Sequence, residues 1–371
     1  MTGFGVARRG AASLVLMAAS GFAGLGYQIV WTQQSALWLG HESAAVLAVV
    51  AAFFGGLAVG AFVLGQRVAR SARPARWYAG CELAVGLWSL VLVFAMHPWS
   101  ALALRLTGVQ PTAGWQWVVA FVGTFVLLLP ATAAMGATLP AMERATAGDD
   151  GHHSRSIAPL YASNTLGAVV GVLAAAFWLV PRLGLARTAG VGIALNLACA
   201  ASALLLFPAA SGVARVPLSA TAETKAAGGL LGRLTLTGLL GIGFEVLVVR
   251  VLSQVTEDTV YTFAMLLAVY LVGTAAGAAA YKRWLDGPGD RPESADWLLG
   301  ALAGACLIGT ATLWGAAALR QATLRFLGGG FNAAVAAEAA LAVVAFGPAT
   351  LVMGALFSHL GDRARAAGVG F

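Results

Sequence analysis

Long apolar segments fill most of this chain and leave few folds open to it. About ten of them follow one another, and each is near the ~20 residues that a helix needs to cross a bilayer. Only 10% of the residues are charged, against roughly 25% in soluble domains. Backbone polar groups find no water inside lipid, so the segments should be helical. We expect helices at residues 11–37, 43–65, 77–96, 115–140, 158–180, 188–207, 229–253, 259–281, 295–318 and 332–357. The sequence predicts an all-α, polytopic transmembrane helix bundle, with the lipid bilayer as its main partner.

The basic residues indicate how the bundle lies in the membrane. Ten spans put both ends on one side, and most of the 22 Lys and Arg residues fall in connections on that side. The positive-inside rule then predicts two cytoplasmic termini, in a bacterial inner (cytoplasmic) membrane. Because orientation explains the net charge of +7, we predict no nucleic-acid partner.

Metal and cofactor sites find little support in the sequence. The 3 cysteines are far apart and all lie in apolar segments, so they indicate neither a disulfide framework nor a zinc site. The segment GDDGHH (148–153) has metal-binding residue types but lies in a Gly-rich connection, where we expect a solvated loop. We predict no metal and no cofactor.

An internal repeat organises the apolar segments. GYQIVWTQQ at 26–34 corresponds to GFEVLVVRV at 243–251, and PATAAMGATL at 130–139 corresponds to PATLVMGALF at 348–357. An even number of predicted helices separates the two copies, so both should insert the same way up. Parallel repeats of this kind are found in the two halves of major facilitator transporters.

The repeat predicts how the chain is divided. We expect a first transmembrane repeat at 1–210 with six helices, a cytoplasmic linker at 211–228, and a second repeat at 229–371 with four. Counterparts of the first copy's last two helices are missing, so the sequence predicts a truncated second repeat.

Several segments together resemble a known family. SGFAGLGYQIVW, AAFFGGLAVGAFVLGQRVAR, PATAAMGATLP and LYASNTLGAVVG look like the membrane part of bacterial proteins that fuse a major-facilitator-like domain to a spermidine synthase-like domain. The first helix of that family often reads YEVVWTR, whereas this chain has YQIVWTQ. Nothing here matches the family's aminopropyl-transferring domain, so no enzymatic activity is predicted.

The resemblance implies two different functions. One is a transporter-like membrane domain that moves a small cationic metabolite such as a polyamine. The alternative is a membrane anchor or regulatory scaffold for a fused or neighbouring spermidine synthase-like enzyme, which would then be a partner of this chain.

Polar and flexible side chains within the helices are the candidates for lining a path through the bundle. Ionisable residues in a membrane segment are functional candidates by default, and prolines at matching places in two repeats point to a binding site. The candidate cavity-lining residues are Gln28, Gln33, Glu82, Thr132, Met135, Glu245, Arg250, Glu338, Thr350 and Met353. The alternative is that these residues only hold helices together.

Small residues and prolines form a second, structural set. Small residues spaced four apart let helix backbones approach closely, and a proline inside a helix removes one backbone hydrogen bond and kinks it. The predicted packing residues are Gly56, Gly60, Gly167, Gly171, Gly273, Gly277, Pro130 and Pro348.

The repeat itself suggests that two polar positions are coupled. The first copy has two neutral amides, Gln28 and Gln33, where the second has Glu245 and Arg250. Losing one charge would strand the other, whereas losing both should be tolerated. We therefore expect the double variant Glu245→Gln/Arg250→Gln to give a higher folded yield than the two single variants predict by addition. A yield at or below the additive value would rule out the coupling.

Overall fold

The computed structural model describes residues 3–39, 42–146, 157–207, 224–256, 260–285, 293–328 and 330–366. Every regular element among these residues is a helix, which confirms the all-α prediction. The chain divides into two compact units, Met1–Val216 and Pro217–Phe371. The GDDGHH segment and residues 211–223 of the predicted linker lie outside the described residues.

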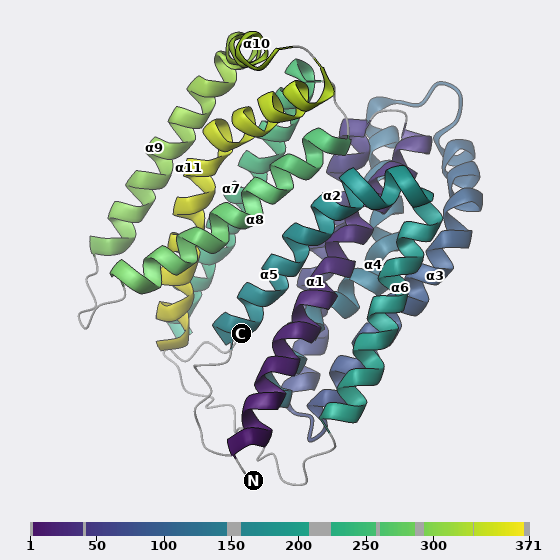
Figure 1. The fold of residues 1–371 in the computed structure, drawn as a ribbon, viewed down its shortest axis with the longest axis vertical. Coiled ribbons are helices and arrows are strands. Elements are labelled where there is room, and N and C mark those ends of the chain that lie inside the picture. Colours follow the sequence, from purple (N-terminus) through teal and green to yellow (C-terminus); the bar gives the residue numbers. More distant parts are fainter. Residues whose placement is uncertain are drawn as a thin grey trace. The chain divides into compact units, whose positions relative to one another are not determined.

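Unit 1 is a bundle of long helices (Figure 1). Its elements are α1 (Gly3–Leu39), α2 (Glu42–Ala69), α3 (Pro74–Thr107), α4 (Ala113–Thr146), α5 (Ile157–Ala174), the π-helical segment η2 (Ala175–Leu179) and α6 (Val180–Leu206). α1 packs against α5, α6 and α2, while α4 packs against α2 and α3. This arrangement places α1 and α4 in contact with most of the other helices of the unit.

Unit 2 is built around one helix. Its elements are α7 (Thr224–Val255), α8 (Val260–Ala280), the π-helical segment η3 (Tyr281–Leu285), α9 (Glu293–Trp314), α10 (Ala316–Leu327) and α11 (Phe331–Ala366). α11 packs against α8, α9 and α7 (Figure 1). It therefore has the central place in unit 2.

Nine stretches of the described residues are long and apolar enough to cross a membrane. One of them, Pro159–Leu206, has 48 residues, and as a single helix it would be ~72 Å long. Gly184 interrupts it with a positive φ of 77°, a conformation that glycine adopts without strain. Counting a span on each side of Gly184 gives the ten that the sequence predicts.

Several helices are longer than predicted: α1 begins at Gly3 rather than near residue 11, and α11 ends at Ala366 rather than near residue 357. α3 continues through Pro98 to Thr107, well past the expected end near residue 96, and prolines are tolerated in transmembrane helices. The predicted helix 295–318 instead ends at Trp314, and the separate helix α10 follows. α10 carries Arg320 and Arg325, so it is too polar to count as part of a span.

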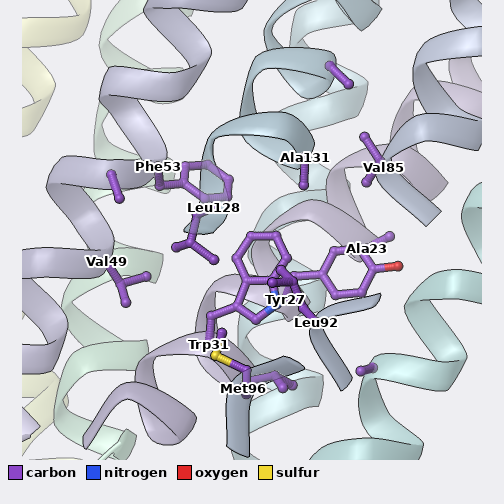
Figure 2. Close-up of a cluster of buried hydrophobic side chains, with 14 of the residues drawn as sticks. Ala23, Tyr27, Trp31, Val49, Phe53, Val85, Leu92, Met96, Leu128 and Ala131 are labelled. Carbon is purple, nitrogen blue, oxygen red and sulfur yellow. The ribbon is translucent and has the colours of Figure 1, made fainter. Parts of the chain in front are cut away.

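The core of unit 1 is built around two aromatic side chains of α1. The rings of Tyr27 and Trp31 are stacked with centroids 5.3 Å apart, and both side chains are 1% exposed. Figure 2 shows them surrounded by apolar side chains from α2, α3 and α4, including Phe53, Leu92 and Leu128. Burying such a cluster stabilises the bundle through dispersion contacts, since lipid gives little hydrophobic driving force between helices.

Glycines bring pairs of helices into backbone contact in both units. In unit 1, a Cβ added to Gly60 of α2 would overlap the carbonyl oxygen of Ala133 on α4. In unit 2, a Cβ added to Gly277 of α8 would overlap the carbonyl oxygen of Leu351 on α11. The four residues occupy matching positions of the repeat, so each unit contains the same helix contact.

The same pairs of helices also make the reverse contact, in which the glycine lies on α4 or α11 and the carbonyl oxygen on α2 or α8. A Cβ on Gly136 of α4 would overlap the carbonyl oxygen of Leu57 on α2, and one on Gly354 of α11 would overlap that of Thr274 on α8. Side chains larger than hydrogen at these points would push the helices apart.

We expect Gly60→Ala to destabilise the protein, because the added methyl group meets backbone that cannot rotate away. Overpacking of this kind costs about 1–3 kcal/mol. Gly65→Ala on the same helix is the matched control, since a Cβ there meets no atom within 4 Å. Thermal unfolding in detergent should show a lower midpoint temperature for Gly60→Ala than for the wild type, and an unchanged midpoint for Gly65→Ala. Equal midpoints would mean that the contact is looser than described.

Candidate functional site

The first helix of each unit contacts the proline-containing helix through a glycine and a methionine. A Cβ on Gly24 of α1 would lie 3.8 Å from the sulfur of Met135 on α4. A Cβ on Gly241 of α7 would lie 3.5 Å from the sulfur of Met353 on α11. Both methionines are partly buried candidate residues. Each unit therefore repeats this contact.

One turn after each of these glycines lies the polar residue that the repeat singles out. Gln28 follows Gly24 by four residues, and Glu245 follows Gly241 by four, so each side chain lies on nearly the same helix face as its glycine. Gln28 is 0% exposed and Glu245 is 3% exposed. The structure thus gives the two candidates equivalent, buried positions.

Buried polar atoms without partners mark this face of α1. Thr32 and Ser35 follow Gln28 at the i+4 and i+7 positions, so the three side chains form one stripe, and they are 4%, 0% and 0% exposed. Neither amide atom of Gln28 and neither hydroxyl of the other two hydrogen-bonds to any described residue. A buried polar group without a partner costs about 1–3 kcal/mol, so such a stripe is suited to water or a polar ligand.

Glu245 has the same property in unit 2. Its Oε2 atom is buried and has no hydrogen-bond partner among the described residues. Arg250, five residues on, has an exposed side chain, and five residues correspond to ~140° around a helix. The two members of the predicted charge pair therefore lie in different environments on α7. Gln33, which matches Arg250 in the first copy, is only partly buried.

The two threonines of the proline motif lie at helix contacts. Thr132 is buried on α4 opposite Gly56 of α2, and Thr350 is buried on α11 opposite Gly273 of α8. Thr132 donates a hydrogen bond to the carbonyl of Leu128 at 3.0 Å. The other hydroxyl, that of Thr350, donates to Gly347 at 2.9 Å. Both hydroxyls therefore find partners within their own helices.

Glu82 belongs to a separate polar network in the core of unit 1. Its carboxylate is 0% exposed and accepts two hydrogen bonds, from the Ser20 hydroxyl of α1 and from the Asn196 amide of α6, both at 2.6 Å. Tyr27 donates from its hydroxyl to the Asn196 side-chain oxygen at 2.8 Å. The network ties α1, α3 and α6 together, and each carboxylate oxygen has a donor.

This network and the stripe of unpartnered atoms occupy different faces of α1. Ser20 and Tyr27, seven residues apart, lie on one face, whereas Gln28 is rotated by ~100° from Tyr27. The structure therefore does not bring Glu82 together with Gln28, although the sequence suggested both as lining residues.

Unit 2 has two buried polar pairs of its own. Thr262 of α8 donates to Glu338 of α11 at 2.9 Å, and both side chains are 5% exposed. Tyr281 and His359 form a hydrogen bond of 3.1 Å, with the histidine 4% exposed. Both pairs join α11 to the α8–η3 helix.

Sequence reasoning missed several members of these pairs. Ser20, Asn196, Thr262 and His359 were not among the candidates, although each is a polar residue inside an apolar segment. A polar side chain inside an apolar segment could have singled out Asn196 and His359, since such residues within a membrane bundle usually pair with another polar group. Ser and Thr are too common in transmembrane helices to stand out.

Comparisons with known proteins address the fold. No protein-family model matches the chain, and no curated protein matches its sequence. Among solved structures, the chain is similar to a bacterial homologue of the human lysosomal transporter Spinster, in an inward-facing and unoccupied conformation. The match covers 100% of this chain and 78% of the other, with a TM-score of 0.54 and 13% sequence identity.

The chain has a major-facilitator-like fold. The predicted fold class is thereby confirmed, and the protein is a multi-pass membrane protein. Of the resemblance drawn from the sequence, the major-facilitator-like part is supported, and the comparisons contain nothing on a spermidine synthase-like domain. The orientation of the termini stays a prediction.

The Glu82 network makes a graded prediction. Asn196→Ala removes a charge-assisted donor from a buried carboxylate, and the loss of such a bond costs about 1.5–3 kcal/mol. Tyr27→Phe removes only the outer, neutral bond, so its effect should be smaller, about 1 kcal/mol. Thermal unfolding in detergent should rank wild type above Tyr27→Phe and Tyr27→Phe above Asn196→Ala. The reverse order would show that Glu82 does not depend on Asn196.

Proposed function

We propose that this protein is a secondary transporter and that it moves a small cationic metabolite such as a polyamine. Glu245 is the residue that binds the cation. The proposal rests on one observation, the buried carboxylate oxygen of Glu245 that has no hydrogen-bond partner among the described residues.

A cationic ligand would compensate the free-energy cost of burying that carboxylate. Burying an ion costs several kcal/mol unless a partner of opposite charge or a set of donors compensates it. The amines of a polyamine supply both a positive charge and N–H donors. The fold supports the same conclusion, since the structural neighbour is a homologue of a transporter.

The two repeats then have unequal roles. In unit 1 the equivalent residue is Gln28, an uncharged amide within a stripe of hydroxyl groups. A neutral amide can donate and accept hydrogen bonds to a ligand without adding a charge of its own. We expect Gln28 to orient the substrate or its hydration water and Glu245 to provide the electrostatic attraction.

A flux measurement tests the proposal. The full chain is reconstituted into liposomes, and uptake of labelled putrescine and spermidine is compared with that of neutral and anionic solutes. Glu245→Gln carries the residue that the first repeat has at the matching position, and its uptake is compared per amount of folded protein reconstituted. We expect it to reduce polyamine uptake by about tenfold or more, the loss corresponding to ~1.4 kcal/mol or more of binding.

Asp296→Asn is the control, because it removes one carboxylate from an exposed position of α9. Its uptake should equal that of the wild type. No flux of any small organic cation, or equal flux in Glu245→Gln and wild type, would overturn the proposal.

The sequence resemblance favours a second function, that of a membrane anchor or regulatory scaffold for a spermidine synthase-like enzyme. The two proposals differ in what they require. A scaffold needs a synthase-like protein that co-purifies with this chain, and it needs no flux. Co-purification without polyamine uptake would therefore favour the scaffold.

A further inference from the structure

A groove on unit 1 lies outside the polar elements described so far. It has a volume of about 520 Å³ and runs along α3, beside the connection from α2. Its lining residues are Leu64, Ser71, Arg73, Arg76, Trp77, Gly80, Cys81, Ala84 and Ala134. The polar residues come from the α2–α3 connection and the first turn of α3, whereas small and apolar residues line the remainder.

The polar end of the groove carries positive charge, and none of the residues that line the groove is acidic. Arg73 and Arg76 both have exposed side chains, and the sequence contains no acidic residue between Glu42 and Glu82. Both carboxylate oxygens of Glu82 are bound to Ser20 and Asn196 in the core. This end of the groove is therefore complementary to an anion.

A hydroxyl group adds a donor at the same end. The Ser71 hydroxyl oxygen accepts the backbone N–H of Arg73 at 3.1 Å, which leaves its own proton available to a ligand. Two guanidinium groups and one hydroxyl suit a phosphate, since arginine binds phosphate oxygens through paired N–H groups.

The length of the groove matches one leaflet of a bilayer. Arg73 and Ala84 are eleven positions apart, which corresponds to ~16 Å along a helix. Half of the hydrocarbon core of a bilayer is ~15 Å thick. Trp77 lies one turn after Arg73, and tryptophan is enriched at the boundary between headgroups and hydrocarbon. The groove thus extends from headgroup depth toward the middle of the membrane.

The apolar end opens outward from the bundle. Gly80 and Ala84 are exposed, and Leu83 and Leu87 beside them are 42% and 50% exposed. On α2, Phe62 is 75% exposed. Large exposed apolar side chains on a membrane bundle are those that contact lipid, so the groove is accessible to an acyl chain.

We propose that this groove is a binding site for one anionic phospholipid of the membrane. The phosphate binds to Arg73, Arg76 and the Ser71 hydroxyl, and an acyl chain lies along Gly80, Cys81 and Ala84. Occupancy would hold the α2–α3 connection at the membrane surface. The groove is built from residues of unit 1 and does not include Glu245, so the proposal does not depend on the transport function.

Native mass spectrometry of the purified full chain tests the charged end. We expect retention of phosphatidylglycerol and little retention of zwitterionic phosphatidylcholine. Arg73→Gln/Arg76→Gln should lower phosphatidylglycerol occupancy by about tenfold, given the attraction between each arginine and anionic lipid. Arg67→Gln/Arg70→Gln is the matched control, because it removes the same charge from exposed positions of the same segment that do not line the groove.

A second pair of variants tests the apolar end. Gly80→Leu places a side chain in the groove, and its Cβ meets no other atom within 4 Å. We expect it to lower phosphatidylglycerol occupancy while the protein stays folded. Gly190→Leu on α6 is the matched control, an exposed glycine with equally open surroundings. It should retain the lipid.

The outcomes separate a lipid from a soluble anion. Displacement of the lipid by inorganic phosphate at millimolar concentration would show that the arginines bind any phosphate group. Unchanged occupancy in Gly80→Leu would show that no acyl chain lies along Gly80. Either result would overturn the lipid site. Equal losses in Arg73→Gln/Arg76→Gln and Arg67→Gln/Arg70→Gln would also overturn it, because they would indicate general attraction to the membrane surface.

Discussion

Close approach of helix backbones is the contact on which the rest of this structure depends. In lipid, helices gain little from burying apolar side chains against one another, so packing has to come from dispersion contacts at short range. The glycines of α2 and α4 in unit 1, and those of α8 and α11 in unit 2, allow this approach in both directions. With the helix spacing set in this way, the side chains between glycines have fixed neighbours.

The fixed spacing explains why the buried polar residues fall into two kinds. Some have partners across a helix contact, as Glu82 has in Ser20 and Asn196, and these residues hold the bundle together. Others, such as Gln28 and Glu245, are buried on faces where no described residue bonds to their free polar atoms. A polar group of the second kind carries a desolvation cost that a ligand can remove, which is why the transport proposal depends on Glu245 rather than on Glu82.

The groove along α3 extends the same reasoning to the outer surface of unit 1. Glycine and alanine at Gly80 and Ala84 leave space where other positions of the helix carry leucine. Small residues can therefore serve opposite purposes in one bundle. Where they face another helix, they bring the two backbones together. Where they face lipid, they leave room for an acyl chain.

The sequence by itself predicted the all-α class, a count of about ten spans and the correspondence between Gln28 and Glu245. These predictions follow from segment length, hydropathy and an aligned repeat, which can all be read along the sequence without knowing any contact between helices. Only the tertiary structure decided which helix face meets which neighbour. It placed Thr132 against Gly56 and joined Glu82 to Asn196, 114 residues away. It also placed two arginines at the end of an open groove. The physical reason is that an apolar helix in a membrane is hydrophobic all around, so its sequence carries little record of its orientation until neighbouring helices are in contact with it.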